Sequence, residues 1–305
     1  MGAPRAAHSA RRRTGNPGMM PLAIRQLSPD LLQDAASMLS YDFMRNAFVA
    51  GGCIALAAGL VGYFVVLRNQ VFTSDALGHV AFTGGLAGLL AGVALVPAVF
   101  ASTVLGAVAI GTLGGRARGR DVAIGTMFAW VLGLGALLLS LYTTSRSAAT
   151  GNVGVSILFG SILTLQAPQA AVAVTAGLAA SAGLLLICRP LLFASIDPDV
   201  ATAQGVRVRL VTLAFLVLVG VTVAEAVQAV GALLIFGLLV TPAAIAHAIT
   251  ANPYRGIALS AGLAVCFVWL GTALAFYLSL PPSFLIIAAS FAAYVATALA
   301  TRGRD

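Results

Sequence analysis

The sequence contains no lysine, a single glutamate and few charged residues of any kind. Charged residues make up 9% of its 305 positions, all 17 basic residues are arginine, and apolar residues make up 60%. A typical soluble domain carries roughly 25% charged residues. Together with a mean hydropathy of +1.01, this composition predicts an integral membrane protein without a soluble domain of useful size.

Several catalytic motifs are also missing. A Walker A loop ends in Gly-Lys-Ser/Thr, so a chain without lysine has no P-loop with which to hydrolyse ATP. The sequence contains neither H-E-x-x-H nor G-x-S-x-G, which argues against an intramembrane metalloprotease or serine hydrolase. Cys53, Cys188 and Cys266 stand singly and are expected to be packing residues. We therefore expect that the chain is not an enzyme and binds no permanent cofactor.

Apolar segments of about 20 residues, enough to cross roughly 30 Å of hydrocarbon, recur along the chain. The candidate spans cover residues 47–67, 76–94, 96–113, 122–142, 170–188, 210–227, 231–249, 257–278 and 283–300. The expected fold is an all-α polytopic bundle of eight or nine transmembrane helices, forming one permease-type domain over residues 41–305. Within it, Gly84, Gly88 and Gly92 recur at four-residue spacing, which predicts close helix packing.

The arginines indicate which loops face the cytoplasm. One set of alternate loops contains all the arginines from residue 68 onward except Arg146. The net charge of the whole chain, +8, thus reflects arginines in loops and tails and does not indicate nucleic acid binding. Residues 1–40 include three consecutive arginines and are expected to form a disordered tail. Nine spans would place this tail outside, so either the tail is atypical or one segment does not cross.

Two loops carry predicted structure. The outer loop contains S-I-L-F-G-S-I-L (156–163), which is too short to span and predicts a reentrant or interfacial helix. The inner loop contains I-D-P-D-V-A-T-A-Q-G-V (196–206). Here Asp197 predicts an N-cap, Pro198 the first helical position and Gly205 the C-terminal cap. The result is a short cytoplasmic helix suited to docking a partner.

Asp75 and His79 are the strongest candidates for a functional site. Residues at i and i+4 share one face of a helix, where a carboxylate and an imidazole can together hold a divalent cation. The alternative is a helix start at the membrane boundary, with Asp75 capping the first amides and His79 packing. Because an unpaired ionisable group inside a membrane is costly, we favour the functional interpretation. Two side chains do not saturate a transition metal, whereas a symmetric dimer supplies the pair twice.

Two further residues are weaker candidates for metal ligands. Glu225 falls near the outer end of an apolar segment, where it could meet an arriving cation or simply reach the membrane interface. His247 lies near the inner end of its span and is more simply an interfacial histidine.

Five ordered motifs resemble the membrane permeases of ABC-type zinc, manganese and iron importers. They are R-N-Q-V-F-T-S-D-A-L-G-H (68–79), R-D-V-A-I-G-T-M-F (120–128), I-L-F-G-S-I-L (157–163), D-P-D-V-A-T-A-Q-G-V (197–206) and V-G-A-L-L-I-F-G-L-L-V-T-P-A-A-I-A (230–246). The resemblance implies a metal pathway at Asp75 and His79, enclosed by two permease copies. It also implies a coupling helix, containing Asp197, Pro198, Asp199, Ala201 and Gly205, that touches an ATPase.

The resulting functional expectation is the permease of a bacterial plasma-membrane importer. It requires a cytoplasmic ATP-binding subunit and an extracytoplasmic metal-binding receptor as partners. Zn²⁺ leads narrowly over Mn²⁺ and Fe²⁺ as the transported ion, because imidazole suits zinc and manganese prefers more oxygen ligands. A gradient-driven transporter with Asp75, His79 and Glu225 as a proton relay is the alternative class. A vitamin B12-type permease is less suited to a carboxylate and imidazole pair.

Overall fold

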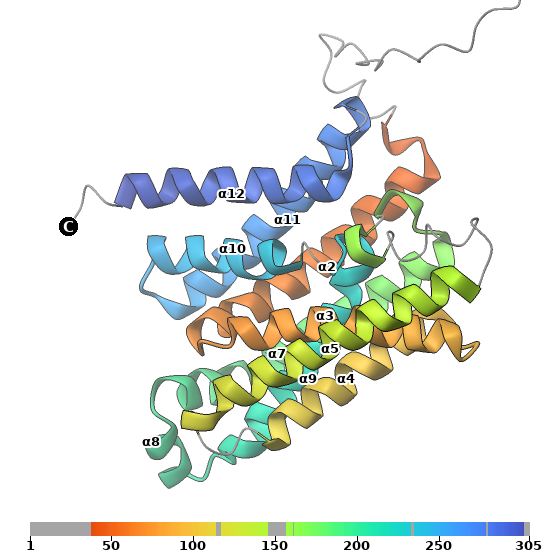
Figure 1. Ribbon diagram of the computed structural model, residues 1–305. Helices are drawn as coiled ribbons and strands as arrows, with labels where there is room; N and C mark the ends of the chain where they lie inside the picture. The colour runs from red at the N-terminus through yellow and green to blue at the C-terminus, as the bar shows by residue number, and fades with distance from the viewer. Residues whose placement is uncertain are drawn as a thin grey trace, which may run out of the picture.

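The computed structural model describes residues 38–113, 117–145, 157–160, 162–232, 235–278 and 280–301. In these ranges all regular secondary structure is helical, as predicted. The helices, shown in Figure 1, are α2 (Asp42–Leu67), α3 (Val71–Leu90), α4 (Leu95–Leu113), α5 (Ala117–Ser145), η2 (Ile162–Thr164), α7 (Ala167–Ile196), α8 (Pro198–Ala203), α9 (Val208–Ala229), α10 (Ile235–Ile249), α11 (Pro253–Leu278) and α12 (Pro282–Thr301). The expected N-terminal tail lies almost wholly outside the described residues.

Each predicted span corresponds to a helix, although several boundaries differ. Seven of the described helices are long and apolar enough to cross a membrane. Two further helices occupy predicted spans but do not reach this length and hydropathy. They are α3, which carries more polar residues, and α10, which has only 15 residues. The spans predicted at 76–94 and 231–249 are wrong at their ends. Helix α3 stops at Leu90, before Gly92 (φ +79°), and α10 begins only at Ile235, after Gly231 (φ +95°).

Helix α2 forms the centre of the bundle. It packs against α7, α9, α10 and α11, and glycines allow the closest of these contacts. A Cβ added to Gly62 would lie 2.0 Å from the carbonyl oxygen of Leu239 in α10. A Cβ added to Gly59 would lie 2.6 Å from Cα of Ala261 in α11. Since real Cβ atoms do not approach so closely, glycine at these two positions is what brings the helix backbones together.

Helices α3, α4 and α5 pack together on another side of the bundle, with α3 in contact with both of the others. The predicted glycine packing holds at Gly84 and Gly88, where added Cβ atoms would meet Ser102 and Ala98 of α4 at 2.1 and 2.2 Å. Gly92 does not belong to this contact. Its positive φ ends α3, and an added Cβ would find no atom within 4 Å.

The predicted reentrant helix is broken into two pieces. Residues 157–159 are helical, Gly160 has φ +67°, and η2 follows. The carbonyl of Ile157 accepts a hydrogen bond from the backbone N–H of Ala232 at 3.0 Å, and a Cβ on Gly160 would lie 2.5 Å from the nitrogen of Gly231. This segment therefore packs against the backbone between α9 and α10, compensating for the short α10.

Candidate functional site

Asp75 and His79 both lie on α3, one turn apart. The helix begins at Val71 with Gln70 as its N-cap, so Asp75 falls in the second turn and does not cap the helix. This removes the capping alternative raised by the sequence. Both side chains are half-buried, and in the described part of the chain neither has a hydrogen-bond partner. A ligand could therefore bind to them without displacing a hydrogen bond of the described structure.

The pair faces α5. The rings of His79 and Phe128 meet edge to face, with centroids 4.9 Å apart. Asp75 borders a cavity of about 340 Å³ that is also lined by Phe72, Ile124, Gly125 and Phe128. The other residues that line the cavity are apolar or glycine and offer a cation no charged or polar side chain. A cation held there would therefore be bound mainly through Asp75 and His79.

One chain alone does not complete a metal site at this position. Across the described residues, no group of three or more histidine, cysteine, aspartate or glutamate side chains is close enough to hold a metal ion. The structure thus brings Asp75 and His79 together but joins neither Glu225 nor His247 to them. A transition metal requires at least four ligands, so water or a second copy of the chain must supply the rest.

Glu225 is enclosed by its own chain. It is 0% exposed, and neither carboxylate oxygen has a hydrogen-bond partner in the described structure. A Cβ added to Gly177 in α7 would lie 3.1 Å from Glu225 Oε2 and 3.0 Å from the carbonyl oxygen of Cys53 in α2. The carboxylate therefore sits between α2, α7 and α9 and has no exposed surface in this chain.

His247 has structural partners. Its ring stacks on that of Tyr63 at a centroid distance of 4.2 Å and an interplanar angle of 16°. Its Nε2 lies 3.2 Å from the Tyr63 carbonyl oxygen, which accepts a hydrogen bond from an Nε2–H. These contacts tie α10 to α2 and give His247 a packing role that the sequence did not indicate.

The inner loop has the predicted capped helix, α8. Asp197 Oδ1 accepts hydrogen bonds from the backbone N–H groups of Asp199 at 3.1 Å and Val200 at 3.0 Å. Pro198 is the first helical residue, and Gly205 ends the segment with φ +85°. Ala201 is fully buried, which anchors the helix on its inner side. Local sequence was sufficient here because each cap bonds to its own turn.

Helix α8 lies at one end of the bundle (Figure 1). Ile196, the last residue of α7, is 69% exposed, and Val200 in α8 is 44% exposed. Asp199 in α8 is also exposed. The segment around α8 contains Arg189, Arg207 and Arg209, so the positive-inside rule predicts that it faces the cytoplasm. Exposed apolar residues on a short rigid helix in water are typical of a protein-binding surface.

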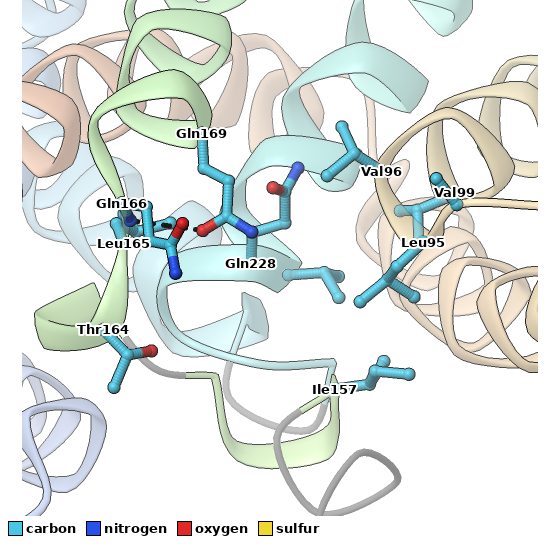
Figure 2. Close-up of a pocket in the computed structure, with 11 residues that line it drawn as sticks. Leu95, Val96, Val99, Ile157, Thr164, Leu165, Gln166, Gln169 and Gln228 are labelled. Carbon is cyan, nitrogen blue, oxygen red and sulfur yellow. Dashed lines mark hydrogen bonds between the residues drawn. The ribbon is translucent and has the colours of Figure 1, made fainter.

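A polar pocket at the opposite end of the bundle was not predicted. It has a volume of about 360 Å³ and lies between the ends of α4, α7 and α9. Figure 2 shows Gln166, Gln169 and Gln228 around it, with the backbone N–H of Gln166 donating to Gln169 Oε1 at 3.2 Å. The only signal for this pocket in the sequence is the presence of three glutamines at the ends of uncharged segments. Their convergence depends on how α7 and α9 pack.

Comparisons with known proteins agree with this architecture. A protein-family model described as the ABC 3 transport family matches residues 40–301. The chain is 32% identical over 274 residues to the uncharacterized membrane protein slr2045 of Synechocystis sp., covering 88% of this chain and 95% of that protein. It is 29% identical over 241 residues to the manganese import system permease protein ScaB of Streptococcus parasanguinis, covering 79% and 84%.

The fold also matches a solved complex. The structure of PsaBC from Streptococcus pneumoniae in complex with Fab superimposes with a TM-score of 0.76 and 25% sequence identity. The match covers 87% of this chain and 94% of the matched chain.

Proposed function

The chain belongs to the ABC 3 transport family, and we propose that it is the membrane permease through which an ATP-driven importer moves Mn²⁺ into a bacterial cell. It is a multi-pass protein of the bacterial plasma membrane. The observation that carries the proposal is the pair of Asp75 and His79, which share one face of α3 and have no hydrogen-bond partner among the described residues, with Asp75 bordering a cavity beside α5. Such a pair suits a dehydrated divalent cation passing through the membrane.

Manganese is proposed in preference to the zinc favoured by the sequence. Zinc sites use soft or nitrogen ligands in a tetrahedral arrangement, whereas manganese accepts carboxylate and water in six-coordinate sites. The described structure adds no cysteine or second histidine to the pair. A relative that covers 79% of the chain is a manganese import system permease protein. Zn²⁺ and Fe²⁺ remain the ions to test against it.

The remaining ligands are proposed to come from a second copy of the chain and from water. Two copies around a two-fold axis would present two carboxylates and two imidazoles. Water molecules would complete six-coordination and keep exchange fast. A metal-binding receptor would deliver the ion at the outer face.

Energy is proposed to come from a partner ATPase. The chain contains no lysine and therefore no Walker A loop. The exposed Ile196, Asp199 and Val200 offer a surface for an ATP-binding subunit. Closure of two such subunits on ATP would move α8 and shift the permease between inward-open and outward-open states.

The test is transport by the reconstituted complex. The chain would be co-expressed with an ATP-binding subunit from the same genome, placed in liposomes, and assayed for radioactive Mn²⁺ movement with ATP on the side of α8. ATP-dependent Mn²⁺ transport that excess Zn²⁺ inhibits only weakly is expected. If the complex transports Zn²⁺ or Fe²⁺ in preference to Mn²⁺, the proposed identity of the transported ion is wrong. Transport by the chain alone under a proton gradient would contradict the ABC mechanism and favour a secondary transporter.

A further inference from the structure

Arg68 lies at the inner end of α2 and reaches two other helices. Its Nη1 donates a hydrogen bond to Ser195 Oγ at 3.2 Å, and its Nη2 donates to Thr212 Oγ1 at 2.9 Å. The guanidinium also lies over the ring of Phe215, 5.7 Å from the centroid. One side chain thereby holds the ends of α2, α7 and α9 together.

The two hydroxyl groups flank the coupling helix. Ser195 is in the last turn of α7, two residues before the N-cap Asp197, and Thr212 is in the second turn of α9, which follows α8. The hydroxyl of Ser195 is itself fixed, because it donates to the carbonyl of Leu191 at 2.5 Å. Any displacement of α8 that carries its flanking helices therefore acts on the guanidinium of Arg68.

On its other side, Arg68 is joined to the metal-binding helix by a short, ordered turn. The N–H of Arg68 donates to the carbonyl of Phe64, and that of Gln70 donates to the carbonyl of Val65 at 2.8 Å. Asn69 adopts φ +52°, and α3 starts directly afterwards at Val71. With only three residues between the helices, a shift of the end of α2 carries over to α3.

We propose that Arg68 is a positioning residue that couples movement of α8 to the orientation of Asp75 and His79. This inference rests on the proposed ATP-driven function and extends it by assigning the mechanical link. Two hydroxyl acceptors and an aromatic face suit a planar guanidinium, which can bond to both at once and stack. A lysine ammonium has the same charge but lacks the planar, rigid arrangement of N–H donors that a guanidinium has.

The experiment measures coupling directly. Wild type, Arg68→Ala and Arg68→Lys would be purified with the ATP-binding subunit and reconstituted. Three quantities would be followed: Mn²⁺ binding, ATP hydrolysis, and Mn²⁺ transported per ATP. Arg255→Ala is the matched control, because Arg255 is an exposed arginine on α11, which is not one of the helices that flank α8 in the chain. A second variant, Ser195→Ala with Thr212→Val, removes both acceptors and leaves Arg68 in place.

We expect Arg68→Ala to lower Mn²⁺ transported per ATP by about tenfold or more, within the usual range of coupling between sites. Mn²⁺ binding should stay within about twofold of wild type, since Arg68 does not touch the ligands. Arg68→Lys should be intermediate, the double acceptor variant should match Arg68→Ala, and Arg255→Ala should retain the wild-type ratio.

The possible failures are distinguishable. If wild type shows no ATP-dependent transport, the proposed function itself is wrong. If wild type transports and the double acceptor variant keeps the wild-type ratio of Mn²⁺ to ATP, the coupling role of Arg68 is wrong and the function stands. Should Arg68→Ala fail to assemble, the double acceptor variant decides alone, because its small, nearly isosteric changes leave the arginine in place.

Discussion

Asp75 and Glu225 are both carboxylates within apolar helices, but their surroundings differ. Asp75 is half-buried on α3 and borders a cavity, with His79 one turn away. Glu225 is 0% exposed on α9 and enclosed by α2 and α7. A transported ion must reach a ligand and leave it again. Access, more than the presence of a charge, is therefore what separates a transport ligand from an enclosed acidic residue.

The largest effect on transport is expected at Asp75 and His79, called the open pair below. Asp75→Ala or His79→Ala should reduce Mn²⁺ uptake by roughly a hundredfold, because each removes a charged or polar ligand worth about 3 kcal/mol. Folding should be retained, with the melting temperature within about 2 °C of wild type, since neither side chain makes a hydrogen bond within the described part of the chain. Radioactive Mn²⁺ uptake and thermal unfolding in detergent measure the two quantities.

Asp42→Ala is the matched control for this pair, because Asp42 is an exposed aspartate paired only with Arg45. It should transport at the wild-type rate. Wild-type uptake by His79→Ala would remove the open pair from the metal pathway and, with it, the contrast with Glu225.

The second effect separates binding from coupling. Gly205 has φ +85° and open space where a Cβ would lie, so a substitution is limited by backbone conformation and not by a clash. Gly205→Val should distort the end of α8 and lower transport about tenfold, since a β-branched residue resists this conformation. Mn²⁺ binding at the open pair should persist in equilibrium binding measurements.

Gly205→Asn provides the control, because asparagine tolerates the left-handed region. It should recover most of the transport and the co-purification with the ATPase. If valine and asparagine behave alike, the cap geometry is irrelevant to docking.

A smaller effect is expected at His247, which has partners. His247→Ala removes the ring stacked on Tyr63 and the hydrogen bond to its carbonyl. The loss should lower the free energy of unfolding by about 1–2 kcal/mol while uptake stays within about twofold. Denaturant or thermal unfolding in detergent tests this. A collapse of uptake with unchanged stability would place His247 in the pathway after all.

The smallest effect on transport is expected for Glu225→Gln. The amide keeps the shape of the carboxyl group at an enclosed position where the described structure shows no hydrogen-bond partner, so stability should be about unchanged. Uptake should stay within about twofold of wild type, the ordinary range for a residue outside the pathway. A loss as severe as that of Asp75→Ala would show that Glu225 meets the ion and that the enclosed state opens during transport.

Much of the fold could be predicted from local sequence. Long apolar segments separated by arginines identified the positions of the helices, because hydrophobic length and burial in lipid are properties of one segment. The caps of α8 at Asp197 and Gly205 were predicted for the same reason. The ends of α3 and α10 were missed, since positive-φ glycines ended or delayed the helices inside apolar sequence.

Hydropathy and residue spacing were enough to predict the membrane class, the helix positions, the absence of a Walker A loop, and the placement of Asp75 and His79 one helical turn apart. The packing of the helices was needed to show that Asp75 borders a cavity while Glu225 is enclosed, that three glutamines meet at one end of the bundle, and that Arg68 bonds to Ser195, 127 residues away. Hydropathy and capping act within a few turns. Contacts between distant segments depend on which faces of the helices pack together.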